Sequence, residues 1–256
     1  MSGAVADTVV HDDGESGQGG YIQSLVESLH ASSVESMRID MLTTASAAIA
    51  ASARIIYHGR PVKNSSDGGG EDQLVEWSGI DFVWFDANLR IVRTHTLIDM
   101  DGLRTGNPNV SRTPTLNYQP VPPGFDIDAH YRGYLNAVNT NRSNDHLAKF
   151  CQPIITHNEQ VSDLDEFIGL LEDAFSRIED YTLTIKDLIT DKVTQRVAVR
   201  LELSGKPVKE AFGIQPTGRP VRFPEHAMYQ LDGGKIAFVW AIRDFDTYRK
   251  CIGGSE

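Results

Sequence analysis

Cysteine and long apolar runs are both scarce in this chain. Its 256 residues include only Cys151 and Cys251, which excludes the multi-bridge scaffold of small secreted domains. No C-x-x-C or H-E-x-x-H spacing occurs, so the sequence predicts no metal site. No apolar run approaches the roughly 18 residues of a spanning helix, and the acidic N-terminus lacks a signal peptide's apolar segment. We therefore expect a cytoplasmic protein.

Positive charge is also in deficit. The chain has 24 Lys and Arg against 35 Asp and Glu, a net charge of −11 at pH 7. This balance disfavours nucleic acid and anionic membrane surfaces as partners. The rest of the composition, 40% hydrophobic and 23% charged, is ordinary for a globular protein, and the length allows one large or two small domains.

A meander of three strands is predicted near the C-terminus. Strand-length apolar runs over 197–203, 221–231 and 236–242 are separated by Gly and Pro. Gly233 and Gly234, between the last two runs, supply the positive φ that a tight hairpin needs. We therefore expect the three strands to pair antiparallel in chain order.

The two halves of the chain repeat each other. Residues 54–63 (RIIYHGRPVK) lie over 200–209 (RLELSGKPVK), an offset of 146 residues (200 − 54), and the same offset sets Tyr21 on Phe167. The match also covers the Ala-rich segment 45–51, which favours a helix by propensity alone, and assigns it to a strand pair instead.

The copies are unequal in length. We expect a disordered tail over 1–20, a truncated copy over 21–104, a proline-rich linker over 105–125 and a complete copy over 126–256. Only the second copy has room for a further set of predicted elements, namely a helix over 127–139, a short helix over 145–150 and a short strand over 153–157.

The second copy resembles the SnoaL-like polyketide cyclases of the nuclear-transport-factor-2-like superfamily. The motifs that carry the resemblance are Gly205-Lys206, Phe212-Gly213-Ile214-Gln215-Pro216-Thr217-Gly218, Tyr229-Gln230-Leu231, Gly234-Lys235-Ile236 and Trp240…Asp244. Lys206-Pro207 and Gln230 depart from the family pattern. The resemblance implies an α+β fold, in which a curved antiparallel sheet and its helices form a cone around a pocket, preceded here by a partial repeat of the same sheet.

A fused partial copy has a structural reason to exist, because an exposed apolar sheet otherwise invites association. We expect the first copy to pack sheet-to-sheet on the second as an internal pseudo-dimer, and a homodimer remains open. After a one-residue difference in hairpin length, Asp99 lies on Asp244 and His95 on Trp240. Without a closed cone around them, we interpret Asp99 and His95 as relics or interface residues.

Three residues are candidates for catalysis. Asp244 follows Trp240 by four residues and matches the position where SnoaL-like cyclases place their catalytic acid/base; the alternative is an Asp in a strand-end turn. His157 ends the predicted strand where the family often has a pocket histidine; the alternative is a solvated His. Tyr134, by likeness to the ketosteroid-isomerase branch, would donate a hydrogen bond to an enolate; the alternative is a core Tyr.

Further residues are candidates for the pocket wall. A two-residue turn would pair residue 227 with Trp240, put Glu225 and Tyr229 on the Trp240 face and point His226 away, whereas a one-residue bulge would reverse this. The candidates for substrate binding are Trp240, Tyr229, Glu225, His226, Phe212, Ile214 and Glu210.

The resemblance implies a cofactor-independent acid/base cyclase or isomerase that acts on a polyketide- or terpenoid-like carbonyl compound in specialised metabolism. Its partner would be a small hydrophobic substrate. A second reading is a dehydratase, or epoxide hydrolysis as in the limonene-epoxide-hydrolase-like branch, which uses an Asp/Arg/Asp set; Arg243 adjoins Asp244, but strand neighbours face opposite ways. A third reading is a non-catalytic module for ligand binding or association.

Overall fold

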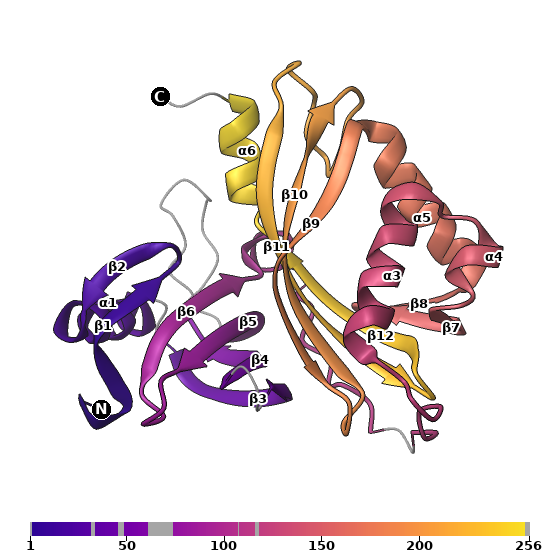
Figure 1. Cartoon of the computed structure of the whole chain (residues 1–256). Coiled ribbons are helices and arrows are strands. Elements are labelled where there is room, and N and C mark those ends of the chain that lie inside the picture. The colour runs from indigo at the N-terminus through magenta and orange to yellow at the C-terminus, as the bar shows by residue number, and fades with distance from the viewer. Residues whose placement is uncertain are drawn as a thin grey trace. The chain divides into compact units, whose positions relative to one another are not determined.

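The computed structural model divides the chain into two compact units, Met1–Thr113 and Pro114–Glu256. The residues that it describes are 2–31, 34–45, 49–60, 74–106, 108–115 and 118–253. The division falls within the segment predicted to be a linker. Each unit is built around its own six-stranded sheet, so the α+β class is confirmed (Figure 1).

The N-terminal unit contains sheet A, whose strands lie in the order β2-β1-β6-β5-β4-β3. β1 pairs parallel with β6, and the other neighbours pair antiparallel. Its elements are η1 (Ser2–Ala4), β1 (Val5–His11), β2 (Gly14–Gly17), α1 (Gln18–Ala31), β3 (Val34–Ala45), β4 (Ala50–Gly59), β5 (Val75–Phe85), β6 (Ile91–Ile98) and α2 (Met100–Thr105).

The C-terminal unit contains sheet B, whose strands lie in the order β8-β7-β12-β11-β10-β9. β12 pairs parallel with β7, and the other neighbours pair antiparallel. Its elements are α3 (Ile127–Thr140), α4 (Asn144–Leu147), β7 (Cys151–His157), β8 (Gln160–Asp163), α5 (Leu164–Arg177), β9 (Ile178–Asp191), β10 (Arg196–Pro207), β11 (Val221–Asp232), β12 (Lys235–Arg243) and α6 (Phe245–Gly253).

The repeat extends over more of the chain than the sequence match did. The offset of 146 residues carries the bounds of β1, β2 and α1 onto those of β7, β8 and α5 (151 − 5, 160 − 14 and 164 − 18). The strand orders of the two sheets correspond in the same way. As the alignment predicted, strands pair on both sides of the Ala-rich segment: Ala45 of β3 pairs with Ala50 of β4, while residues 46–48 lie outside the described residues.

The prediction of a disordered tail over 1–20 is wrong. Val5 and Val9 are buried against Tyr21, so this polar segment carries enough apolar side chains to form a strand. Asp12 and Asp13 both have positive φ, as a tight hairpin turn between β1 and β2 requires. The predicted lack of a first strand is therefore also wrong. In the described residues, the first copy lacks counterparts of α3 and α4 alone.

α3 and α5 cover one face of sheet B, here called the helix-covered face (Figure 1). α3 buries residues three and four apart against the sheet, including Tyr131, Tyr134 and Val138. α5 begins with a capping box between Asp163 and Glu166. This face carries the apolar core of the unit, so any polar group on it stands out.

Candidate functional site

The pairing of β11 with β12 decides which side chains face the helices. The turn at Gly233 and Gly234 is tight, but a bulge follows it: Leu231 pairs with Ile236 and Gln230 with Phe238, so one residue of β12 is skipped. Trp240 therefore pairs with Met228, and its face is the one that carries Met228 rather than Tyr229.

The predicted common face of Trp240, Glu225 and Tyr229 is wrong for this reason. Glu225 and Tyr229 lie on the helix-covered face, where Tyr229 belongs to the core. Trp240 and His226 lie together on the opposite face. The structure thus contains the one-residue bulge that reverses the facing expected from a simple two-residue turn.

The helix-covered face carries a buried ion pair that crosses from β12 to β11. Arg243 Nε donates to Glu225 Oε2 at 2.6 Å. The Glu225 side chain is 5% exposed and that of Arg243 is 30% exposed, so the carboxylate is buried and the arginine side chain is partly accessible to solvent. The guanidinium also lies 5.6 Å from the Phe212 ring centre. A charged pair in an apolar core is costly, which marks it as a candidate functional feature.

Other titratable groups gather around this pair. Burial and, to a lesser extent, the positive charge of Arg243 together lower the pKa of His157 to about 4, so the imidazole is neutral at pH 7. Burial alone would lower the pKa of Arg243, but Glu225, Tyr181 and Tyr229 outweigh it and raise that pKa. Burial raises the pKa of Tyr181 and Tyr229, so both phenols stay protonated.

An aromatic cluster closes the other side of the site. The Tyr229 ring lies 5.0 Å from that of Tyr131 and 6.0 Å from that of Tyr134, both on α3. Tyr134 also meets the Phe150 ring at 6.4 Å. Burial raises the pKa of Tyr131 and Tyr134 well above the ordinary value. The arrangement provides rigid apolar walls with phenolic hydroxyls beside one buried ion pair.

Comparison with known proteins identifies the C-terminal unit. Residues 128–250 match the family model of the SnoaL-like polyketide cyclases. We call the C-terminal unit the SnoaL-like unit after this match. No curated protein matches the chain.

Solved structures align with about half of the chain. A SnoaL-like polyketide cyclase from Agrobacterium tumefaciens is 26% identical, with a TM-score of 0.46, and the alignment covers 49% of this chain and 97% of that one. TsrD from Streptomyces laurentii is 22% identical, with a TM-score of 0.45 and coverage of 50% and 94%. IdmH from Streptomyces antibioticus is 22% identical, with a TM-score of 0.45 and coverage of 51% and 100%.

In the SnoaL-like unit, Asp244 is a helix cap. Its Oδ1 accepts from the Thr247 amide at 2.9 Å, and its Oδ2 accepts from the Thr247 hydroxyl at 2.6 Å. The counterpart Asp99 caps α2 in the same way, by accepting from the Gly102 amide at 2.8 Å. The shared position thus has a shared structural use, and a catalytic role for Asp244 stays a prediction.

Three of the predicted wall residues of the SnoaL-like unit lie in one loop. Phe212 packs on Phe245 and Tyr248, with ring centres 4.8 and 5.6 Å away, and Ile214 packs on the same core. Glu210 is exposed, and its carboxylate accepts a hydrogen bond from the side-chain amide of Gln215. The loop thus brings Phe212 to Arg243 and leaves Glu210 at the surface.

The predicted residues on the opposite face of sheet B have another environment. His226 is 3% exposed and its Nε2 lies 3.3 Å from Arg200 Nε, which donates to it. Trp240 is equally buried. In the N-terminal unit, His95 faces Trp84 and the turn residues Asp12 and Asp13.

Sequence reasoning missed Arg243, Tyr181 and Tyr131 as site residues. Arg243 was weighed only as the neighbour of Asp244, and its cross-strand partner Glu225 depends on a bulge that no local motif announces. No sequence motif marked Tyr181, on β9, as a site residue. In the described part of the chain, no group of His, Cys, Asp and Glu could hold a metal ion, and no described helix is long and apolar enough to cross a membrane.

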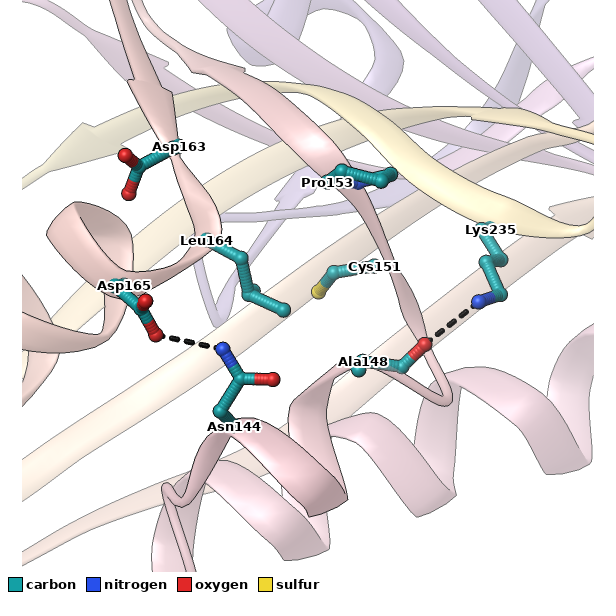
Figure 2. Close-up of a pocket in the computed structure, with 8 residues that line it drawn as sticks. All are labelled: Asn144, Ala148, Cys151, Pro153, Asp163, Leu164, Asp165 and Lys235. Carbon is teal, nitrogen blue, oxygen red and sulfur yellow. Dashed lines mark hydrogen bonds between the residues drawn. The ribbon is translucent and has the colours of Figure 1, made fainter.

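A pocket of about 360 Å³ lies elsewhere in the SnoaL-like unit, between α4, β7 and the start of α5 (Figure 2). Figure 2 shows its polar groups already engaged: Asn144 Nδ2 donates to Asp165 Oδ1 at 2.6 Å, and Lys235 Nζ donates to the Ala148 carbonyl at 2.7 Å. Burial raises the pKa of Cys151 to about 12, so its thiol is not a nucleophile. The Glu225–Arg243 ion pair lies outside this pocket.

Proposed function

We propose that the SnoaL-like unit is a cofactor-independent acid/base enzyme that acts on a small apolar carbonyl compound at the Glu225–Arg243 pair. The observation that carries this proposal is a partly exposed arginine side chain, whose guanidinium is oriented by a buried carboxylate among aromatic side chains. The family name of cyclases makes ring closure or isomerisation of a polyketide- or terpenoid-like substrate the leading reaction class. Deprotonation next to the carbonyl is the step common to both.

Arg243 is assigned to the substrate oxygen. Its guanidinium is permanently charged and held by Glu225, so it can donate to a carbonyl oxygen without first being reoriented. Deprotonation beside the carbonyl moves an electron pair onto that oxygen, and Arg243 would stabilise the resulting enolate. Glu225 acts here as a positioning residue because its Oε2 is already bonded to Arg243.

His157 is assigned to the proton. Its neutral imidazole can accept a proton from carbon, although its pKa of about 4 makes it a weak base in the empty site. Because Arg243 lowers that pKa, an enolate that neutralises Arg243 would raise it during the reaction. In an isomerisation, His157 returns the proton to another carbon. In an aldol-type cyclisation, the enolate carbon attacks a second carbonyl, and the alkoxide that forms takes the proton from His157.

The test compares two variants at the proposed site with one at the rival position. Turnover of a panel of polycyclic ketones is measured for the wild type, Arg243→Met, His157→Gln and Asp244→Asn. We expect kcat/KM to fall by about 100-fold or more in the first two variants, and to change little in Asp244→Asn. Loss of turnover in Asp244→Asn alone would restore the assignment made from the motif. Ligand binding without turnover by any form of the protein would favour a binding module.

Epoxide hydrolysis keeps one observation in its favour, namely that a carboxylate and an arginine do meet in this site. It also needs a second carboxylate, and none of the described acidic residues other than Glu225 acts on the pKa of Arg243. Turnover of a terpenoid epoxide, absent in Glu225→Gln, would support this second candidate.

A further inference from the structure

The N-terminal unit has polar groups at positions where the SnoaL-like unit is apolar. β5 and β6 pair Asp81 with Thr96, and the corresponding pair in sheet B is Ala227 with Ala241. One pleat away, Thr94 replaces Val239, and on the helix Tyr21 replaces Phe167. Conversely, Gly79 and Ile98 stand where Glu225 and Arg243 form their ion pair. The first copy has therefore lost one polar set and carries another; we call Asp81, Thr94, Thr96, Tyr21 and His11 the polar strip.

One carboxylate oxygen of the polar strip has no partner. The Thr96 side chain bonds Asp81, but Asp81 Oδ1 is buried without a hydrogen bond in the described residues. An unsatisfied buried polar atom costs on the order of 1–3 kcal/mol, and more when it is charged. A residue with this cost, at a position where the other copy has alanine, suggests a bound group that satisfies it.

The rest of the polar strip is bonded within itself. His11 Nδ1 lies 2.8 Å from Thr94 Oγ1, and the His11 and Tyr21 rings are 5.5 Å apart. Thr94 also bonds the Tyr21 side chain. These bonds fix the side chains around Asp81 and leave its Oδ1 as the open position.

An aromatic pair lies beside Asp81. The Tyr57 and Trp77 rings are stacked, with centres 5.7 Å apart and an interplanar angle of 18°. A Cβ at Gly79 would lie 3.0 Å from Tyr57 Cε2, so this ring packs over the backbone two residues before Asp81 and on the same face. Aromatic faces next to a carboxylate are the surroundings that organic cations prefer.

The charge around Asp81 is unbalanced. Burial, with a smaller contribution from nearby Asp12, outweighs the hydrogen bond from Thr96 and raises the pKa of Asp81 to about 6. None of the described lysines and arginines acts on this pKa. The other titratable groups that face it are Tyr21 and Tyr57, whose pKa values burial raises, and His11 at the end of the polar strip. Near pH 7.5 the carboxylate is mostly ionised and has no countercharge among the described lysines and arginines.

Solvent reaches this face of sheet A. On β4, Ala53 and Ile55 are half-buried on the Asp81 face, while the alternating Ser52 and Arg54 are buried. On the same face Tyr57 and Trp77 are buried, with 8% and 2% of their surface exposed. The accessible part of this face therefore lies at Ala53, which pairs with Asp81, and at Ile55.

We propose that the polar strip is a second small-molecule site, which binds an organic ammonium ion through Asp81 with the apolar body of the ligand over Ala53 and Ile55, next to the Tyr57 ring. The ammonium donates to the unpartnered Oδ1 and supplies the missing countercharge. This site is separate from the proposed active site and does not depend on it.

The test uses benzylammonium, with benzyl alcohol as the uncharged analogue of the same shape. Binding to the full chain is measured by calorimetry at about pH 7.5, where Asp81 is ionised. We expect benzylammonium to bind at least about tenfold more tightly than benzyl alcohol, and Asp81→Asn to remove that difference. Glu76→Gln, an exposed carboxylate on the same strand, is the matched control and should bind like the wild type.

Two further measurements keep the proposal falsifiable. Arg243→Met should leave benzylammonium binding unchanged; its loss there, with Asp81→Asn unaffected, would overturn the proposal and place the ligand in the SnoaL-like unit. Carbon-13 NMR of the Asp81 carboxyl in the wild type should show its pKa fall when benzylammonium is added. An unchanged pKa, or equal affinity for the alcohol, would overturn the proposal without any variant.

Discussion

At the scale of the residue, two chain neighbours of opposite charge have different surroundings. Arg243 ends β12 and turns its guanidinium to Glu225 among the aromatic side chains of the core. Asp244 turns its carboxylate to Thr247 at the start of α6. The first is an ion pair in a low-dielectric region, where a missing partner is expensive; the second is a capping interaction of modest size.

Removing one partner of the Glu225–Arg243 pair should therefore lower the free energy of unfolding more than replacing both partners by apolar residues. We expect Glu225→Gln to lower the free energy of unfolding by about 2–3 kcal/mol, at or below the range of a fully buried pair because Arg243 is 30% exposed. The double variant Glu225→Met with Arg243→Met should recover much of this loss. Urea denaturation measures both, and Glu202→Gln is the control: it breaks pairs with the exposed Arg222 and Lys186 and should lose less than about 1 kcal/mol. A double variant weaker than Glu225→Gln would contradict the argument.

His157 makes stability depend on pH in a predictable direction. Its pKa is about 4 in the folded chain, lowered by burial and then by Arg243, against an ordinary value of 6.5. The unfolded state therefore binds the proton first, and stability is lost as the pH falls from about 6.5 towards 4, by on the order of 1–3 kcal/mol. His157→Gln should flatten the stability profile in this window, as measured by chemical denaturation at several pH values. A profile that keeps its slope in the variant would assign the effect to other groups.

At the scale of the element, the same cap begins α2 and α6. Asp99 and Asp244 each accept from an amide three residues later, and the repeat sets one on the other. Helix capping therefore explains the aspartate at both positions of this chain without a catalytic role.

Loss of either cap should therefore destabilise its own unit. We expect Asp244→Ala and Asp99→Ala each to cost about 1 kcal/mol, and the Asn variants to cost less, because Asn also caps helices. Amide hydrogen exchange should accelerate at Thr247 and Tyr248 in Asp244→Ala and stay unchanged there in Asp99→Ala. Equal acceleration in both variants would contradict independent caps.

The elements also show what the sequence could predict. The offset of 146 residues predicted the strand pair around 45–51 against its helix propensity, and the structure confirms it. Carried further towards the N-terminus, the same offset would have set His11 on His157 and revealed β1; composition alone suggested a tail instead. The faces of β12 could not be predicted, because the bulge beside Gln230 depends on pairing energies along two whole strands rather than on a local signal.

At the scale of the whole molecule, the two units share strand order, helix positions and even the bulge. β5 and β6 skip one residue between Trp84 and Phe85, as β11 and β12 do between Gln230 and Leu231. Only the SnoaL-like unit has α3 and α4 among the described elements. The backbones correspond while the polar side chains do not, so each unit has its own candidate site.

Because the registers of the two sheets match, side chains of sheet B can be introduced at the equivalent positions of sheet A. Gly79→Glu with Ile98→Arg would transplant the ion pair of sheet B into sheet A at matching register. The graft also needs Tyr57→Leu, the residue that sheet B has at position 203, because a Cβ at residue 79 would press on the Tyr57 ring. The repeat thus provides, within one chain, a sheet that contains a buried charge pair and a second sheet into which the pair can be introduced.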